Sequence, residues 1–368
     1  MQSNNLIKNK KYFFIEYDDN YQFHNRPFEF FKHDPLFKYK KITDLEEIKN
    51  FLSKIDKFKK HSIVLLFISC GKNGRTRKSI TKYYILCSLL EFAENLNKIT
   101  IIPSIDFDYW YNSWNFVTNP YYKYFNLNIF KYNTFKYLCP IDYKKLGYVL
   151  DQDTYKYQNN IIEWAPHSCY QSCIKDINYD PINLILVSGQ VRRVHYPERE
   201  KILNFENTVC KTPGKFRNIQ NMWLESSEGS YSDYLNEFIC CFASGRKCED
   251  LTLTNKYNTL NTHNKFIYTD ANFVVLKVFE ILGSGSLLLI PLSYKSTLED
   301  TTGLINGKHF LTVDMSCNKK IQNTINFILD YKNRSLIDKI RSSGHFYAKK
   351  YLSTEKQYKT LRNIILNL

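Results

Sequence analysis

Two charged side chains in the C-terminal half have the types and spacing needed to hold a nucleotide. Lys277 and Glu280 are three residues apart, so on a helix they lie on one face, among Val, Phe, Ile and Leu. Asp270 or Asn272 can cap this helix, leaving its first amides pointing outward as a seat for a diphosphate. Lys277 would then hold a phosphate, and Glu280 both hydroxyls of a ribose. The alternative is an ordinary surface ion pair, because charged pairs on helices are usually solvated.

A second group of candidate residues follows an apolar run in the N-terminal half. Asp106 and Asp108 come directly after residues 99–105, a predicted strand, and α/β sheets bind ligands at the carboxyl ends of their strands. Either carboxylate could deprotonate a hydroxyl group. Three aromatic side chains follow that could stack on sugar faces, namely Tyr109, Trp110 and Trp114. Solvated loop acids beside core aromatics are the alternative interpretation.

Two further segments have residue types suited to a ligand site. His167 follows the predicted strand 161–164 near the middle of the chain, and the pKa of histidine suits acid–base chemistry. A lone histidine is nevertheless more often structural. Residues 71–79 carry two glycines and several basic side chains after a strand, but they lack the residue order of a Walker loop. This segment could neutralise phosphates or be a simple solvated loop.

The elements that must position these groups form two series of strands alternating with helices, the pattern of parallel sheets. Strands are predicted at 12–17, 63–69, 99–105, 137–139, 147–150, 161–164, 183–188 and 286–292, and at the end of 231–242. Helices are predicted at 45–59, 80–96, 197–205, in the first part of 231–242, and at 273–282, 321–331, 335–350 and 354–368. A polar stretch, 167–180, is interpreted as a linker.

This organisation predicts an α/β protein with two Rossmann-like domains facing each other across a cleft. An acceptor-side domain is expected at 1–170 and a donor-binding domain at 171–350. The last helix, within 351–368, is expected to pack back on the first domain. A chain of 368 residues suits two domains rather than one.

The composition excludes some classes of protein and leaves others open. Hydrophobic residues make up 43% and charged residues 24%, which excludes global disorder. The net charge of +15 is spread along the chain, and the abundant Asn, Lys, Ile, Tyr and Phe are residues that A/T-rich codons encode, so no specific nucleic-acid partner is predicted. No transmembrane segment or signal peptide is expected. The 10 cysteines lack the spacing of a metal site, which favours reduced thiols in the cytoplasm.

The segment 231–364 resembles the donor-binding domain of group 1 glycosyltransferases with the GT-B fold. In that family a Lys/Arg-x-x-Glu-x-x-x-x-Gly helix precedes a hydrophobic strand, as Lys277, Glu280 and Gly285 do here before 286–290. An acidic, glycine-containing loop follows, matched by 298–310. Residues 183–189 and 196–199 are similar to the opening strand, glycine turn and Tyr-Pro-x-Arg helix start of the domain. The C-terminal resemblance covers roughly half of the chain.

The resemblance implies a role for individual residues. Glu280 corresponds to the carboxylate that binds the donor ribose, and Lys277 to a basic residue near the diphosphate. Asn272 stands where many members have a glutamate that contacts the donor sugar. The other positions implied on the donor side are Gly189, Arg192 and Arg199.

The predicted reaction is transfer of a sugar from a nucleotide-diphosphate sugar to a hydroxyl of a glycan or protein-linked glycan. The donor is the only co-substrate expected, without a metal or other cofactor, and Asp106 and His167 are the candidate catalytic residues. A different possibility is a GT-A enzyme in which Asp106 and Asp108 hold a divalent metal. Two further hypotheses are a catalytically inactive glycan-binding protein and a nucleic-acid-binding protein, whose affinity would fall steeply with salt.

Overall fold

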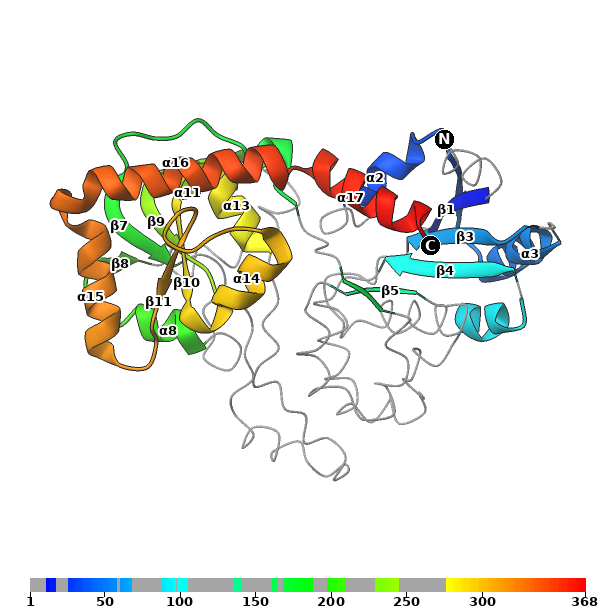
Figure 1. Ribbon diagram of the computed structural model, residues 1–368, viewed down its shortest axis with the longest axis horizontal. Helices are drawn as coiled ribbons and strands as arrows, with labels where there is room; N and C mark the ends of the chain where they lie inside the picture. The colour runs from blue at the N-terminus through cyan, green and yellow to red at the C-terminus, as the bar shows by residue number, and fades with distance from the viewer. Residues whose placement is uncertain are drawn as a thin grey trace, which may run out of the picture. The chain divides into compact units, whose positions relative to one another are not determined.

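The computed structural model describes two compact units of the chain (Figure 1). The described residues are 11–17, 26–57, 60–67, 88–96, 98–104, 136–139, 161–163, 168–187, 197–209, 229–244 and 276–368. The described residues up to 163, together with 358–368, form the first unit. The described residues between 168 and 357 form the second unit. Both units are built on parallel sheets, as the alternating series of strands and helices predicts.

The first unit contains a four-stranded parallel sheet in the order β2-β1-β3-β4. Its strands are β1 (Lys11–Tyr17), β2 (Phe37–Ile42), β3 (Ser62–Phe67) and β4 (Ile99–Ser104). Every residue of β3 is buried, as expected for a strand covered on both faces, and its sequence is accordingly a continuous apolar run. The chain moves from β1 to one side for β2 and to the other side for β3, so the order reverses between β1 and β3.

Short helices and a separate strand pair complete the first unit. Helix α2 (Arg26–Glu29) leads into the 3-10 turn η1 (Phe30–Lys32), and residues 88–94 are helical. Helix α3 (Leu45–Asp56) begins at the cap Asp44, whose carboxylate accepts the amide of Glu47 at 2.9 Å. The strands β5 (Tyr137–Cys139) and β6 (Ile161–Glu163) pair in parallel.

The C-terminal helix α17 (Thr354–Leu366) packs on the first unit from Tyr358 onward. Leu361 and Ile365 are fully buried in the aromatic cluster that contains Phe14. Asp34 receives hydrogen bonds from the Tyr358 hydroxyl and the Arg362 Nε, both at 2.5 Å. The helix is therefore held by an apolar stripe and by one buried carboxylate.

Replacing Asp34 with alanine is expected to loosen this helix and to destabilise the first unit by about 1–2 kcal/mol, because two donors lose a charged acceptor. Hydrogen exchange of the amides of 358–366 measures the loosening, and chemical denaturation measures the stability. Glu46→Ala is the matched control, since its carboxylate is 70% exposed in an ion pair with Lys49. Equal effects of the two substitutions would contradict the assigned role of Asp34.

The second unit contains a five-stranded parallel sheet in the order β11-β10-β9-β7-β8. Its strands are β7 (Ile182–Val187), β8 (Thr208–Val209), β9 (Phe238–Phe242), β10 (Leu287–Pro291) and β11 (Leu311–Val313). The order reverses between β7 and β9, which makes this a doubly wound sheet. In such sheets the ligand crevice lies at the carboxyl ends of the strands where the order reverses.

Helices cover both faces of this sheet (Figure 1). One face packs on α11 (Gly229–Asn236), α13 (Leu276–Ser284) and α14 (Lys295–Thr302). The other packs on α8 (Pro197–Ile202) and α15 (Asn318–Leu329). Each face of the sheet thus carries one hydrophobic cluster, the first with α11, α13 and α14 and the second with α8 and α15. Helix α16 (Arg334–Tyr351) contributes buried residues to both clusters. Successive side chains of β10 point to opposite faces of the sheet, as in any strand. Leu288 and Ile290 therefore lie in the first cluster, and Leu287 and Leu289 lie in the second.

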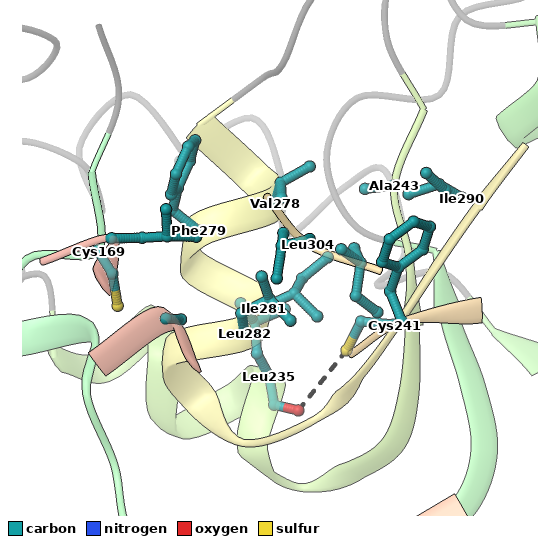
Figure 2. Packing of buried hydrophobic residues seen from close by; sticks show 14 of the residues in the cluster. Cys169, Leu235, Cys241, Ala243, Val278, Phe279, Ile281, Leu282, Ile290 and Leu304 are labelled. Carbon is teal, nitrogen blue, oxygen red and sulfur yellow. Dashed lines mark hydrogen bonds between the residues drawn. The ribbon is translucent and has the colours of Figure 1, made fainter. Parts of the chain in front are cut away.

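Helix α13 is buried nearly all round, because it packs both on the sheet and on other parts of the unit. Figure 2 shows its Val278, Ile281 and Leu282 in the same cluster as Cys241 of β9. Phe279 lies on the side of Cys169 in the same view, and both are buried. A helix with apolar residues on all sides is typical of a protein core.

Most predicted elements are found, with ends shifted by a few residues. The predicted strand 147–150 lies outside the described residues, and β2, β8 and β11 were not predicted. The interpretation of 167–180 as a linker is wrong for its described part, because Cys169, Tyr170 and Cys173 are buried in the core of the second unit. The described residues 168–170 thus belong to the second unit rather than to the predicted 1–170 domain, and 351–357 also stay with it.

Two further observations concern membrane-spanning helices and the state of the cysteines. None of the helices within the described ranges is long and apolar enough to cross a membrane. Cys169, Cys173, Cys240, Cys241 and Cys317 are free thiols, and all but Cys317 are buried.

Candidate functional site

Three segments of the second unit meet the carboxyl edge of its sheet. Helix α13 leads into β10, so it runs antiparallel to the strand and begins at this edge. Helix α8 is the first described element after β7 and begins at the same edge. Ser244 follows the end of β9 by two residues. Lys277, Arg199 and Ser244 therefore lie at the edge where doubly wound sheets bind ligands.

The Glu280 carboxylate is buried one turn inside α13. Its side chain is 1% exposed, and Oε1 accepts a hydrogen bond from the Tyr170 hydroxyl at 3.1 Å. Oε2 lies 2.9 Å from the Lys277 Nζ in a buried ion pair. Among the described residues, no group other than the Lys277 ammonium is placed to donate to this buried Oε2. A carboxylate oxygen has two lone pairs, so Oε2 can accept a second donor beside Lys277.

Lys277 is held between this carboxylate and an aromatic ring. Its Nζ lies 3.9 Å from the centre of the Tyr231 ring of α11. Burial acts to lower the pKa of Lys277, but the charge of Glu280 and the contact with Tyr231 outweigh it, so the net pKa is raised. The side chain is 11% exposed and positively charged at neutral pH. The interpretation as a solvated surface ion pair is therefore wrong: the pair is formed, but in the protein interior.

Tyr170 reaches Glu280 because the segment around it packs closely on α13. A Cβ placed on Gly283 would lie 2.7 Å from the Cys169 Sγ and 3.1 Å from the Cys173 carbonyl oxygen, so only glycine allows this approach. Burial and the nearby Glu280 charge raise the pKa of Cys169 to about 12, which makes this thiol unreactive. Tyr170 and Tyr231 were not predicted as site residues, and nothing in their spacing distinguishes them from the other tyrosines.

Arg199, a predicted donor-binding residue, is at the carboxyl edge but faces the protein. It is 4% exposed, and its Nη2 donates to the Ser244 carbonyl oxygen at 2.7 Å. This hydrogen bond joins α8, which follows β7, to the segment that follows β9. It therefore crosses the position where the strand order reverses. Its guanidinium therefore ties the two sides of the expected crevice together.

The remaining predicted site residues lie outside the described residues. They are Asp106, His167, Gly189, Arg192, Asn272, Tyr109, Trp110 and Trp114, together with Asp108 and the basic segment 71–79. Of the predicted set, the structure brings Lys277 and Glu280 together and places Arg199 at the same edge of the sheet.

A known structure shares the fold of this chain at very low sequence identity. No protein-family model matches the chain, and no curated protein matches its sequence. HepE from Anabaena, solved in complex with UDP and glucose, aligns with 98% of this chain and 100% of its own, with a TM-score of 0.51 at 6% identity. The chain shares the fold of HepE, the GT-B fold. A glycosyltransferase from Rickettsia africae also aligns, over 97% of this chain and 98% of its own, at 10% identity and a TM-score of 0.48.

The GT-B fold argues against a GT-A architecture. The second α/β series, which a GT-A architecture leaves unexplained, forms a complete five-stranded sheet with helices on both faces. The prediction of two Rossmann-like α/β domains is therefore confirmed. Because the identity to HepE is 6%, the likeness concerns the fold and leaves the roles of individual residues to the geometry of this chain.

Proposed function

We propose that this protein transfers a sugar from a nucleotide-diphosphate donor to a hydroxyl acceptor, with Glu280 binding the ribose of the donor. The observation that carries the proposal is the buried Glu280 Oε2, which has Lys277 as its one partner among the described residues and a second lone pair for a further donor. A ribose hydroxyl would supply that donor, and it would do so beside the edge of the sheet where doubly wound folds bind nucleotides. The GT-B fold supports the same function, and HepE was solved with UDP.

The proposal has a structural requirement. Since the Glu280 side chain is 1% exposed, groups around the carboxylate must move when a donor binds. The energy of ribose binding must then exceed the cost of this opening, so the free protein is expected to bind a nucleotide more weakly than a preformed site would.

The reaction itself needs an acceptor activated on one side and a leaving group stabilised on the other. The acceptor oxygen forms a bond to the anomeric carbon, while the bond from that carbon to the diphosphate oxygen breaks and its electron pair stays on the diphosphate. The acceptor proton passes to a base, for which Asp106 and His167 are the candidates. The positive end of α13 and the Arg192 side chain would stabilise the leaving diphosphate without a metal. The acceptor would be a glycan or protein-linked glycan.

A variant without either charge tests the donor site. In Glu280→Gln/Lys277→Met no lone charge is left buried, so the fold should survive, but the ribose loses its carboxylate partner. We expect UDP to bind at least about tenfold more weakly by calorimetry, the loss of one charged hydrogen bond. Glu46→Gln/Lys49→Met removes the same kind of pair, three residues apart, from the exposed face of α3 and should bind UDP as the wild type does.

Unchanged UDP affinity in the Glu280 variant would show that the ribose assignment is wrong. The broader function is tested by thermal unfolding of the wild type with uridine, guanosine, adenosine, cytidine and thymidine diphosphates. A ligand that binds the folded state raises the melting temperature. If none of the five raises it, the protein is not a nucleotide-sugar transferase.

A further inference from the structure

We propose that Tyr170 is a positioning residue for the donor site: its hydroxyl fixes the orientation of the Glu280 carboxylate so that Oε2 faces a ribose. This inference rests on the proposed function. Tyr170 lies in the segment between the two series of strands and helices, 110 residues before Glu280 in the sequence. Nothing in the sequence pattern connects the two residues.

The first argument concerns what holds the carboxylate. The terminal torsion of a glutamate side chain has a broad, roughly two-fold energy profile, so burial alone does not choose the direction of its oxygens. The Lys277 ammonium lies 2.9 Å from Oε2, but it is a point charge on a flexible stem with three rotatable donors, so it follows the carboxylate rather than fixing its direction. Tyr170 is the partner of the other oxygen: its hydroxyl donates a directional hydrogen bond to Oε1 at 3.1 Å. It therefore decides which oxygen stays available.

The second argument concerns the rigidity of Tyr170 itself. The Cys169 amide donates to the Leu352 carbonyl at 2.7 Å, and the Thr354 amide donates to the Cys169 carbonyl at 3.2 Å. On the other side the Cys173 amide donates to the Tyr170 carbonyl at 2.9 Å. The backbone is thus fixed both before and after Tyr170. The side chain is 4% exposed, so the phenol has little freedom to leave its partner.

The third argument concerns the helix face that receives Tyr170. Gly283 lies three residues after Glu280, on the same face of α13, and its carbonyl oxygen accepts the Lys175 amide at 3.0 Å. Because a side chain at Gly283 would collide with Cys169 and Cys173, this glycine sets how near the segment comes to the helix. The spacing of Glu280 and Gly283 therefore brings the carboxylate within reach of the Tyr170 hydroxyl.

The experiment compares two ligands that differ only where the site is expected to act. UDP carries the ribose hydroxyls and 2′,3′-dideoxy-UDP lacks them, so the ratio of their affinities reports the contact with Glu280. In Tyr170→Phe we expect UDP to bind about five- to tenfold more weakly and dideoxy-UDP to bind as it does to the wild type. Tyr347→Phe is the matched control, because it also loses one hydrogen bond from a tyrosine of this unit, to the Thr302 carbonyl at 3.0 Å. Both ligands should bind Tyr347→Phe as they bind the wild type.

The outcomes separate the inference from the function on which it rests. If the affinity ratio collapses in Glu280→Gln/Lys277→Met but is unchanged in Tyr170→Phe, Tyr170 is only structural and the inference is wrong. Equal weakening of both ligands in Tyr170→Phe would also contradict it, since that result reports a general loss of structure. If the wild type binds both ligands equally, the assignment of Glu280 to the ribose fails and the inference fails with it. If the wild type binds none of the five nucleoside diphosphates, the proposed function fails as well.

Discussion

Replacing Gly344 with alanine is expected to destabilise the second unit by about 2–3 kcal/mol, although alanine is the better helix former by about 1 kcal/mol. Gly344 lies within α16, where a Cβ would collide with the carbonyl oxygen of His309 and lie 3.0 Å from the Leu282 Cδ2. The oxygen belongs to the backbone and cannot rotate away. Helix α16 would have to move away from the segment that contains His309, and the packing of α13 on α16 would loosen as a result.

Chemical denaturation of Gly344→Ala and of Ser342→Ala measures this effect. Ser342 is half-buried in the same helix, two residues earlier, so its replacement by alanine tests helix propensity without a collision. We expect Ser342→Ala to change the free energy of unfolding by less than about 0.5 kcal/mol. If Gly344→Ala instead stabilises the protein, as helix propensity alone predicts, the close approach of α16 to His309 is wrong.

Replacing Arg341 with leucine is expected to cost about 3–4 kcal/mol, because several buried polar groups lose their partner together. Arg341 is 1% exposed. Its Nε donates to the Gly285 carbonyl at 3.1 Å, its Nη2 to the Asn178 carbonyl at 2.9 Å and its Nη1 to Asp338 Oδ1 at 2.8 Å. One side chain of α16 thus binds the turn before β10, the segment before β7 and its own helix.

Arg334 provides a matched control for this substitution. It lies on the same helix, donates to the second oxygen of Asp338 at 2.9 Å and to the Tyr179 carbonyl at 3.1 Å, but it is 23% exposed. Water can replace its contacts, so Arg334→Leu should cost less than about 1 kcal/mol. The free energies of unfolding from urea titrations decide the comparison. Similar costs for the two variants would mean that burial of Arg341 adds nothing to its hydrogen bonds.

Local sequence pattern was sufficient for the elements with strong periodicity. The apolar runs at β3, β9 and β10 are buried along their whole length, and such runs are easily recognised. Helix α3 shows a clear apolar stripe behind the cap Asp44. By contrast, β2 reads Phe-Lys-Tyr-Lys-Lys-Ile and has exposed residues in its middle, because it is the edge strand of its sheet. Charged edge strands protect a sheet from pairing with other chains, and the same charges hide them from a search for apolar runs.

The site was predicted only in part, for a comparable reason. The spacing of Lys277 and Glu280 correctly placed the two side chains on one helix face, since contacts three residues apart follow from helix geometry. Spacing cannot report burial, so the same pair was also consistent with a solvated surface. Tyr170 and Tyr231 come from distant segments, and their approach to α13 depends on packing that no local pattern records.

The sequence alone determined the α/β class, two series of strands and helices, and the Lys277–Glu280 pair, because strand and helix periods are local properties of the chain. The tertiary structure decided three further points. It reversed the strand order within each sheet, which sets the position along the carboxyl edge where doubly wound sheets bind ligands. It buried the ion pair, and it brought Tyr170 to Glu280. These depend on which surfaces meet, and contacts between residues more than one hundred positions apart arise only when the whole core packs.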